Sequence, residues 1–185
     1  REILVRLANN YGTQGEWSKA VLTSRKLLDL FPNHPDKPQL LEKIISTYAD
    51  PSKLNNLNLA MQARAELAQK FGPSSRWAKK NETNPRARGK AEKLIGNNIY
   101  RTALYRHTRC EVLRKQSVDS KTPEEKVTFR KLALQNCLVA AANYNRFLKR
   151  FKHHKEAYKL SYYLADTLYF TSQFKDAAIQ FEKVR

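Results

Sequence analysis

The sequence predicts an all-α fold, and three properties of the chain support this prediction. Leu, Ala, Lys, Arg and Gln are abundant among its 185 residues, whereas Gly and Pro number only 5 and 7. This balance favours long helices over the many turns of a β fold. Hydrophobic residues make up 41% of the chain, which is enough to form a buried core. Apolar residues also recur at the three- and four-residue spacing of a helix face.

Residues 1–34 have the pattern of two short antiparallel helices. Apolar residues recur at helical spacing before Gly15, recur again after it, and end at Pro32, which predicts a helix, a tight turn, a second helix and a stop. Small residues stand where the two helices must approach closely, and aromatic residues fill the space beside them. The residues of this pattern are Leu4, Leu7, Ala8, Tyr11, Gly15, Trp17, Ala20, Leu27 and Pro32.

This pattern resembles the tetratricopeptide repeat, a 34-residue helical hairpin that stacks on its neighbours into a right-handed α-solenoid. The stretch "SYYLADTLYFTSQFKDAAIQFEKV" near the end repeats the pattern, with Ser172 in the place of Gly15. The resemblance implies a single solenoid over residues 1–185, as a segment of a longer repeat protein. We expect about four hairpins and one connecting loop, at residues 1–34, 35–72, 84–151 and 154–185, with the loop at 72–84.

The third hairpin is predicted to have unusually long helices. Asn84 before Pro85 is a good start for a helix, and "TPEE" at residues 122–125 is a capping box with Pro at the first helical position. We expect helices from Pro85 to about residue 116 and from Pro123 to Phe151, with the turn near 117–121. At 1.5 Å per residue, helices of about 30 residues are about 45 Å long, so the tip should project beyond the neighbouring hairpins.

The chain has two cysteines, Cys110 and Cys137, at apolar helix positions of this hairpin. If the hairpin turns at about residue 119, the numbers of facing residues sum to about 239, and Cys137 lies level with Thr102. The two sulfurs are then about 12 Å apart along the helix axis. We therefore expect two separate buried thiols and no disulfide.

The net charge of +18 is concentrated in one part of the chain. Residues 1–69 and 161–185 are close to neutral, and nearly all the excess of Lys and Arg lies in residues 70–160. Such a field raises the local concentration of an anionic partner, whether an acidic protein or nucleic acid.

A basic surface is predicted around the base of the third hairpin. Residues on one helix face, residues that end the returning helix, and residues of the 72–84 loop should come together there. They are Arg76, Lys79, Lys80, Arg86, Lys90, Lys93, Arg101, Arg146, Lys149, Arg150 and Lys152. Two interpretations remain: a binding surface for an anionic partner, or a general basic surface with no dedicated ligand. A functionless helix face usually mixes acids among its bases, because like charges four residues apart are destabilising.

Four other residues are candidates for binding or packing roles. Trp77 could stack on a nucleic-acid base, but no series of aromatic residues surrounds it, so we expect it to pack the 72–84 loop onto the fold. Asn9, Tyr162 and Tyr169 are candidates for lining a concave groove. Asn9 also matches one residue of the carboxylate clamp that some tetratricopeptide domains have, but Val5 stands where the clamp requires Lys, which disfavours a clamp.

The sequence contains no catalytic or cofactor motif that we recognise, so we expect no enzyme activity, no metal and no cofactor. It has no apolar run near the ~20 residues that span a bilayer, so no membrane insertion is expected. The C-terminal stretch from "FLKRFKHHKEAYKL" onward resembles bacterial periplasmic and outer-membrane-associated tetratricopeptide proteins. That resemblance implies a non-catalytic protein-interaction scaffold in an envelope assembly or motility complex, and the basic surface predicts that its protein partner is acidic. The alternatives are a helical-repeat protein that binds nucleic acid, a purely structural segment of a longer array, and a cytoplasmic location.

Overall fold

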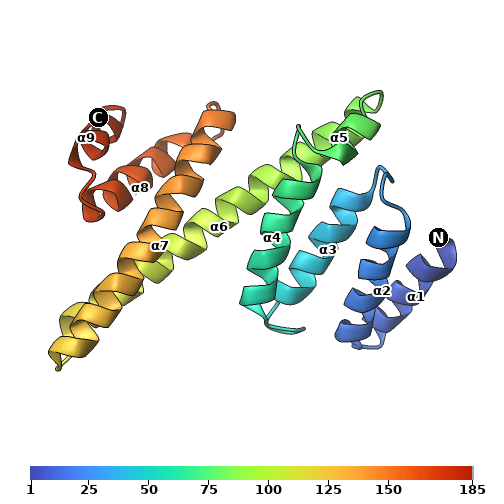
Figure 1. Ribbon diagram of the computed structural model, residues 1–185, viewed down its shortest axis with the longest axis horizontal. Coiled ribbons are helices and arrows are strands. Elements are labelled where there is room, and N and C mark those ends of the chain that lie inside the picture. Colours follow the sequence, from blue (N-terminus) through green and yellow to red (C-terminus); the bar gives the residue numbers. More distant parts are fainter. Residues whose placement is uncertain (185) are drawn as a thin grey trace. The chain divides into compact units, whose positions relative to one another are not determined.

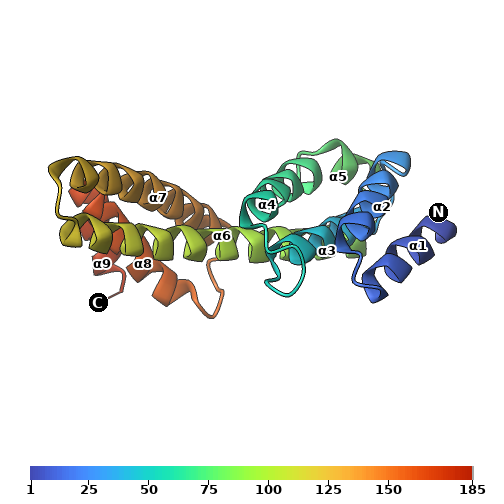
Figure 2. The same ribbon diagram turned by 90° about the horizontal axis from the view of Figure 1, so that it is seen from below.

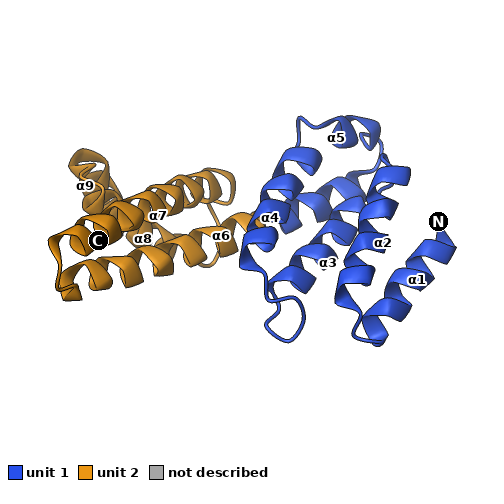
Figure 3. Cartoon of the chain, turned by 60° about the horizontal axis from the view of Figure 1, so that its bottom comes forward, with its two compact units in different colours: residues 1–95 blue, residues 96–185 orange. Residues whose placement is uncertain are grey.

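The computed structural model describes residues 1–184, and this part of the chain contains nine helices and no strand, so the all-α prediction is confirmed. The chain divides into two compact units, residues 1–95 and 96–185 (Figure 3). Each unit is described by itself below. The prediction of one continuous solenoid concerns the packing between the units, and it stays a prediction.

The first unit consists of two helical hairpins, a short helix and the start of a long helix (Figure 1). Helix α1 (Glu2–Thr13) packs on α2 (Trp17–Leu30), and α3 (Lys37–Ala49) packs on both α2 and α4 (Leu57–Phe71). The short α5 (Arg76–Lys80) follows, and α6 (Pro85–Asp119) begins in this unit and continues into the second. The core lies between α3 and its neighbours, where the most deeply buried side chains are Leu41, Ile44, Ile45 and Leu67.

The second unit is built on the hairpin of α6 and α7 (Pro123–Arg150), which run side by side in both views (Figures 1 and 2). Helix α8 (Ala157–Phe170) packs on α7, and α9 (Phe174–Glu182) packs on α8. The two long helices were predicted correctly. Their connection lies at residues 120–122, slightly later in the chain than the predicted turn.

The turns inside the first and last hairpins have the same backbone geometry. Gly15 and Ser172 both have positive φ, +75° and +62°. The next residue then donates its backbone N–H to the preceding helix, from Glu16 to the carbonyl of Tyr11 and from Gln173 to the carbonyl of Leu168. The sequence alignment of Ser172 with Gly15 is therefore confirmed at the level of the backbone.

The turns that follow α2 and α7 are also alike. The backbone N–H of His34 donates to the carbonyl of Phe31, and the backbone N–H of His154 donates to the carbonyl of Phe151. In each turn the imidazole Nδ1 accepts a hydrogen bond from the backbone two residues later, at Asp36 (3.1 Å) and Glu156 (3.2 Å). Both units thus use one turn design to connect successive hairpins.

The segment predicted as a loop at 72–84 contains helix α5, which is a correction to the sequence prediction. Its N-terminus is capped by Ser75, whose hydroxyl accepts a hydrogen bond from the backbone of Ala78 at 3.1 Å. Trp77 is only 3% exposed, contacts Phe71 edge-on, and donates its indole N–H to the carbonyl of His34 at 2.9 Å. The prediction that Trp77 packs this segment onto the fold is confirmed.

Candidate interaction surfaces

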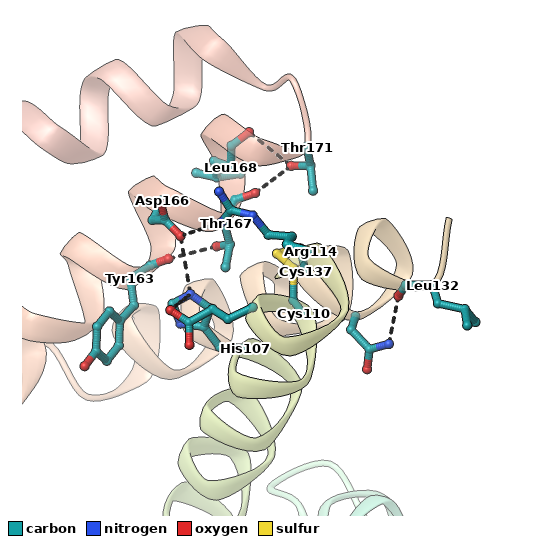
Figure 4. The surroundings of a disulfide bond; sticks show 12 residues. His107, Cys110, Arg114, Leu132, Cys137, Tyr163, Asp166, Thr167, Leu168 and Thr171 are labelled. Carbon is teal, nitrogen blue, oxygen red and sulfur yellow. Dashed lines mark hydrogen bonds and ion pairs between the residues drawn. A yellow bond between two sulfur atoms is a disulfide. The ribbon is translucent and has the colours of Figure 1, made fainter. Parts of the chain in front are cut away.

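The cysteines contradict the sequence prediction, because Cys110 and Cys137 form a disulfide between α6 and α7 (Figure 4). Their Cα atoms are 5.3 Å apart, and both residues are fully buried in a cluster with Leu113 and Ala133. Phe129 and Phe170 pack against this cluster. The bond therefore joins the two long helices at the level where α8 ends.

The error came from the register of the hairpin. When two residues face each other across the hairpin, their numbers add up to 247, whereas the prediction used 239. The observed sum holds for Cys110 with Cys137 and for Gly96 with Phe151. The connection is centred near residue 121 instead of 119, which accounts for half of the difference. The other half is an offset of about one helical turn between the two helices.

This register also changes where the basic residues at the end of α7 lie. With a sum of 247, Arg146 is level with Arg101, whereas the predicted sum of 239 would place it level with Lys93. The Phe151 ring packs so closely on α6 that a Cβ at Gly96 would lie 2.5 Å from it. Glycine at this position lets α7 end directly against α6.

In the first unit, the predicted basic residues lie on α5 and on the first turns of α6. All of them are exposed, and so is Arg88, which the prediction did not include. None forms an ion pair within the described residues. We call these residues the α5–α6 basic surface: Arg76, Lys79, Lys80, Arg86, Arg88, Lys90 and Lys93.

The α5–α6 basic surface rests on a rigid base. The Asn81 side chain is buried and donates to the carbonyl of Asn33 at 3.1 Å, close to the bond from Trp77 to His34. Asn84 then caps α6 through a 2.9 Å hydrogen bond from the backbone of Ala87. The charged side chains therefore extend from a backbone that is fixed on both sides of the turn.

The other predicted basic residues lie in the second unit. Arg101, Arg146, Lys149 and Lys152 are exposed, and the Arg150 guanidinium lies 5.8 Å from the ring centre of Phe151. These residues gather where α7 ends beside α6. Whether the two groups of basic residues act together stays a prediction.

The first unit also has a cavity of about 270 Å³ between α1, α2 and α3, and Asn9 lines it as predicted. The amide oxygen of Asn9 accepts a hydrogen bond from the Lys43 ammonium at 2.7 Å. Lys37 and Arg1 add positive charge to the lining, and Asp36, which pairs with Arg1 at 3.5 Å, is its only acid within the described residues. Burial lowers the pKa of Lys37, and repulsion from Lys70 lowers it further.

The sequence prediction did not include Lys43. Its contact with Asn9 joins α3 to α1, and no spacing within one helix indicates that contact.

Tyr162 and Tyr169, the other groove candidates, lie along the contact between α8 and α9. Tyr162 contacts Phe181 edge-on with ring centres 5.9 Å apart, and Tyr169 contacts Phe174 in the same way at 5.4 Å. Both tyrosines remain more than half exposed. They form part of an aromatic surface, and neither lines the cavity that contains Asn9 or the hollow between α7, α8 and α9.

A polar network beside the disulfide was not anticipated from the sequence (Figure 4). His107 is 5% exposed; its Nδ1 lies 3.1 Å from the Tyr144 hydroxyl and its Nε2 3.4 Å from the Asp166 carboxylate. Arg114 also contacts this carboxylate at 3.4 Å. The hydrogen bond with His107, followed by the charge of Arg114, holds the pKa of Asp166 below its usual range against the effect of burial. The burial of Tyr144 raises the pKa of its phenol. The network joins α6, α7 and α8.

The fold and these surfaces define an all-α protein made of helical hairpins, with exposed basic residues in both units. Comparisons with protein-family models, with curated proteins and with solved structures find no match for the chain. Among residues 1–184, no helix is both long and apolar enough to cross a membrane. The described residues also contain no group of three or more His, Cys, Asp or Glu side chains placed to hold a metal ion.

Proposed function

We propose that this chain is a non-catalytic scaffold that binds an acidic protein partner, built as a tetratricopeptide-like solenoid of about four hairpins. The observation that carries the proposal is the α5–α6 basic surface. Its seven exposed Lys and Arg side chains lie within 18 residues and have no ion-pair partner within the described chain. Unpaired like charges so close together repel one another, which is a cost that an acidic partner removes.

The cavity between α1, α2 and α3 supports the same role. It combines an apolar floor, with Ala8 and Leu27, and a rim with three cations, Arg1, Lys37 and Lys43. An extended acidic segment of a partner has the shape and the charge to enter it. Burial disfavours the charged form of Lys37, and a partner carboxylate at this rim would favour that form and raise the pKa of the lysine toward its ordinary value.

We further propose that the protein works in an oxidising compartment, such as the bacterial periplasm or the outer-membrane surface, in an envelope assembly or motility complex. The disulfide supports this location, because structural disulfides persist outside the reducing cytoplasm. Alkylation of thiols in protein taken from envelope and cytosolic fractions tests the point. With the chain unfolded but not reduced, we expect no alkylated cysteine in protein from the envelope fraction, and two alkylated cysteines would favour the cytoplasmic alternative.

The second candidate function is nucleic-acid binding, which the same basic surface favours. The two functions differ in their response to salt. A nucleic-acid complex that uses the seven cations would lose affinity steeply, because each neutralised phosphate releases a counterion. A protein complex that combines charge with groove contacts would lose less. A purely structural segment of a longer array would bind neither.

The deciding experiment measures binding of a fluorescent poly-glutamate peptide and of a duplex DNA of mixed sequence at two salt concentrations. The test variant reverses four charges of the basic surface: Lys79→Glu, Lys80→Glu, Lys90→Glu and Lys93→Glu. The control reverses four exposed lysines elsewhere, Lys26, Lys121, Lys155 and Lys175, and so has the same net charge.

We expect the test variant to lose peptide binding by about tenfold or more and the control variant to change by less than about threefold. Equal losses in both variants would mean that only total charge matters, and the proposal of a dedicated surface would fail. Tight DNA binding with a steep salt dependence, together with weak peptide binding, would establish the second candidate instead.

A further inference from the structure

The tip of the α6–α7 hairpin extends past the end of α8 (Figure 1). Phe170, the last residue of α8, packs at the level of the disulfide. From there to the start of α7 at Pro123, about 14 residues of α7 have no third helix over them, a length of about 20 Å. No residue between 114 and 132 is buried.

One face of this tip is apolar. The α6 side chains that contact α8 are His107 and Arg114, and Val118 follows Arg114 by one helical turn on the same face. On α7, Leu138 and Ala141 line a hollow with Leu164 and Leu168 of α8. Val127 and Leu134 precede Leu138 by eleven and four residues, so they continue its face toward the tip.

We call Val118, Val127, Leu134 and Leu138 the tip seam. Their exposed fractions are 77%, 68%, 39% and 44%. The seam leads into the hollow of about 410 Å³ between α7, α8 and α9. It is therefore the continuation of the surface on which α8 packs, left open over a length that a helix of about 14 residues would cover.

The charges beside the seam indicate what kind of partner it can bind. Arg130 and Lys131 flank the line of Val127 and Leu134, and Lys115 lies on the facing part of α6; all three are exposed and have no ion pair in the described chain. The acids around the seam are Asp119 beside Val118, Glu124 at the start of α7, Asp176 in the lining of the hollow, and Glu111, whose carboxylate lies 3.9 Å from the His107 ring. A helix with apolar residues on one face and acids along its edges matches this surface. A second copy of the chain does not, because each copy carries a net charge of +18.

We propose that the tip seam is a docking site for an amphipathic, acidic helix of a partner protein, which lies along the hairpin as a continuation of α8. This is the helix-in-groove mode of recognition, in which apolar residues spaced along one face anchor the helix. The disulfide at the base of the tip fixes α6 and α7, the two helices that carry the seam, relative to each other before the partner binds. The proposal extends the scaffold role to a second surface, and it does not depend on the α5–α6 basic surface.

The probe is a fluorescent synthetic peptide of about 15 residues with Leu along one helical face and Glu along both edges of that face. A second peptide has Lys in place of every Glu. The test variant is Val127→Glu with Leu134→Glu. The control is Leu132→Glu with Val139→Glu, which has the same seven-residue spacing on another face of α7 and exposed fractions of 40% and 41%.

We expect the acidic peptide to bind the parent chain, the test variant to weaken binding by about tenfold or more, and the control to change it by less than about twofold. The Lys peptide should not bind. Circular dichroism of both variants confirms that each is folded. The variant with Lys79, Lys80, Lys90 and Lys93 reversed should still bind the peptide, so this proposal and the proposed function can fail separately.

Three results would overturn the inference. The first is an equal loss in the test and control variants, or no binding of the acidic peptide to the parent. The second is self-association of the parent in analytical ultracentrifugation that Val127→Glu with Leu134→Glu abolishes. The third is seam-dependent binding to phosphatidylglycerol vesicles together with no binding of the acidic peptide. The surface would then be a lipid contact.

Discussion

Replacing both cysteines with alanine tests the disulfide and the structural role assigned to it. The bond closes a loop of 27 residues along the chain. The loss of loop entropy in the unfolded chain gives a stabilisation of about 3.5 kcal/mol at 25 °C for a loop of this length. Alanine keeps the buried cluster apolar, so most of the expected loss comes from the bond and not from a buried polar group.

Hydrogen exchange monitored by mass spectrometry is the suitable assay, because it reports each part of the chain separately. Fluorescence would be insensitive, since both tryptophans, Trp17 and Trp77, lie in the first unit. If exchange follows opening of the second unit, a loss of 3.5 kcal/mol accelerates exchange in α7 by about 400-fold. Peptides from α3 and α4 serve as the internal control and should exchange at the parent rate.

The bond itself has a simpler check. Alkylation of the unfolded, unreduced chain should modify no cysteine, and alkylation after reduction should modify two. An exchange rate in α7 of the alanine variant within about fivefold of the parent would refute the stabilising role. Acceleration in α3 and α4 equal to that in α7 would show that the bond acts on the whole chain and not on the second unit.

Two further predictions concern the matching turns at Gly15 and Ser172 and the polar network around Asp166. Ser172 has the left-handed backbone that Gly15 adopts in the matching turn, so Ser172→Gly should stabilise the protein by about 1 kcal/mol in urea denaturation, while Gly15→Ser should destabilise it by a similar amount. Similar effects of the same sign would contradict this account of the turns. The lowered pKa of Asp166 means that its carboxylate stabilises the fold above the ordinary carboxyl pKa near 4, and that this contribution disappears as the pH falls through the lower folded value. Asp166→Asn should therefore cost about 1 kcal/mol or less at pH 7, because the group is partly exposed, and the difference from the parent should shrink as the pH falls below the ordinary carboxyl pKa; a difference that grows on acidification would reverse the argument.

The sequence predicted the helices because their signals are local. Apolar spacing, Pro85 and Pro123 at helix starts, and the cap at Thr122 all act within one or two turns, and the structure has helices where they indicate. Helix α5 was missed because its five residues are too few to show a period. Its N-cap, Ser75, lies in a stretch of polar residues and prolines that favours a loop.

The disulfide was missed because register across a long hairpin is not a local property. Moving the turn by two residues changes the sum of the two facing residue numbers by four. Sliding one helix along the other by one helical turn changes this sum by about four more. The combined error of eight residues separated Cys110 from Cys137 by about two helical turns. Similarly, the network around His107 joins three helices. The spacing of residues within one helix does not indicate that Tyr144 and Asp166 contact the same imidazole.

The position of the disulfide also bears on how this segment is made. Cys110 and Cys137 lie on successive helices, and they are the only two cysteines of the sequence. Within this segment a single intramolecular pairing exists, so oxidative folding requires an oxidant but no isomerase to correct wrong bridges. The thiols can meet as soon as α7 has been synthesised, before α8 covers the hairpin, and once buried they are out of reach of reductants.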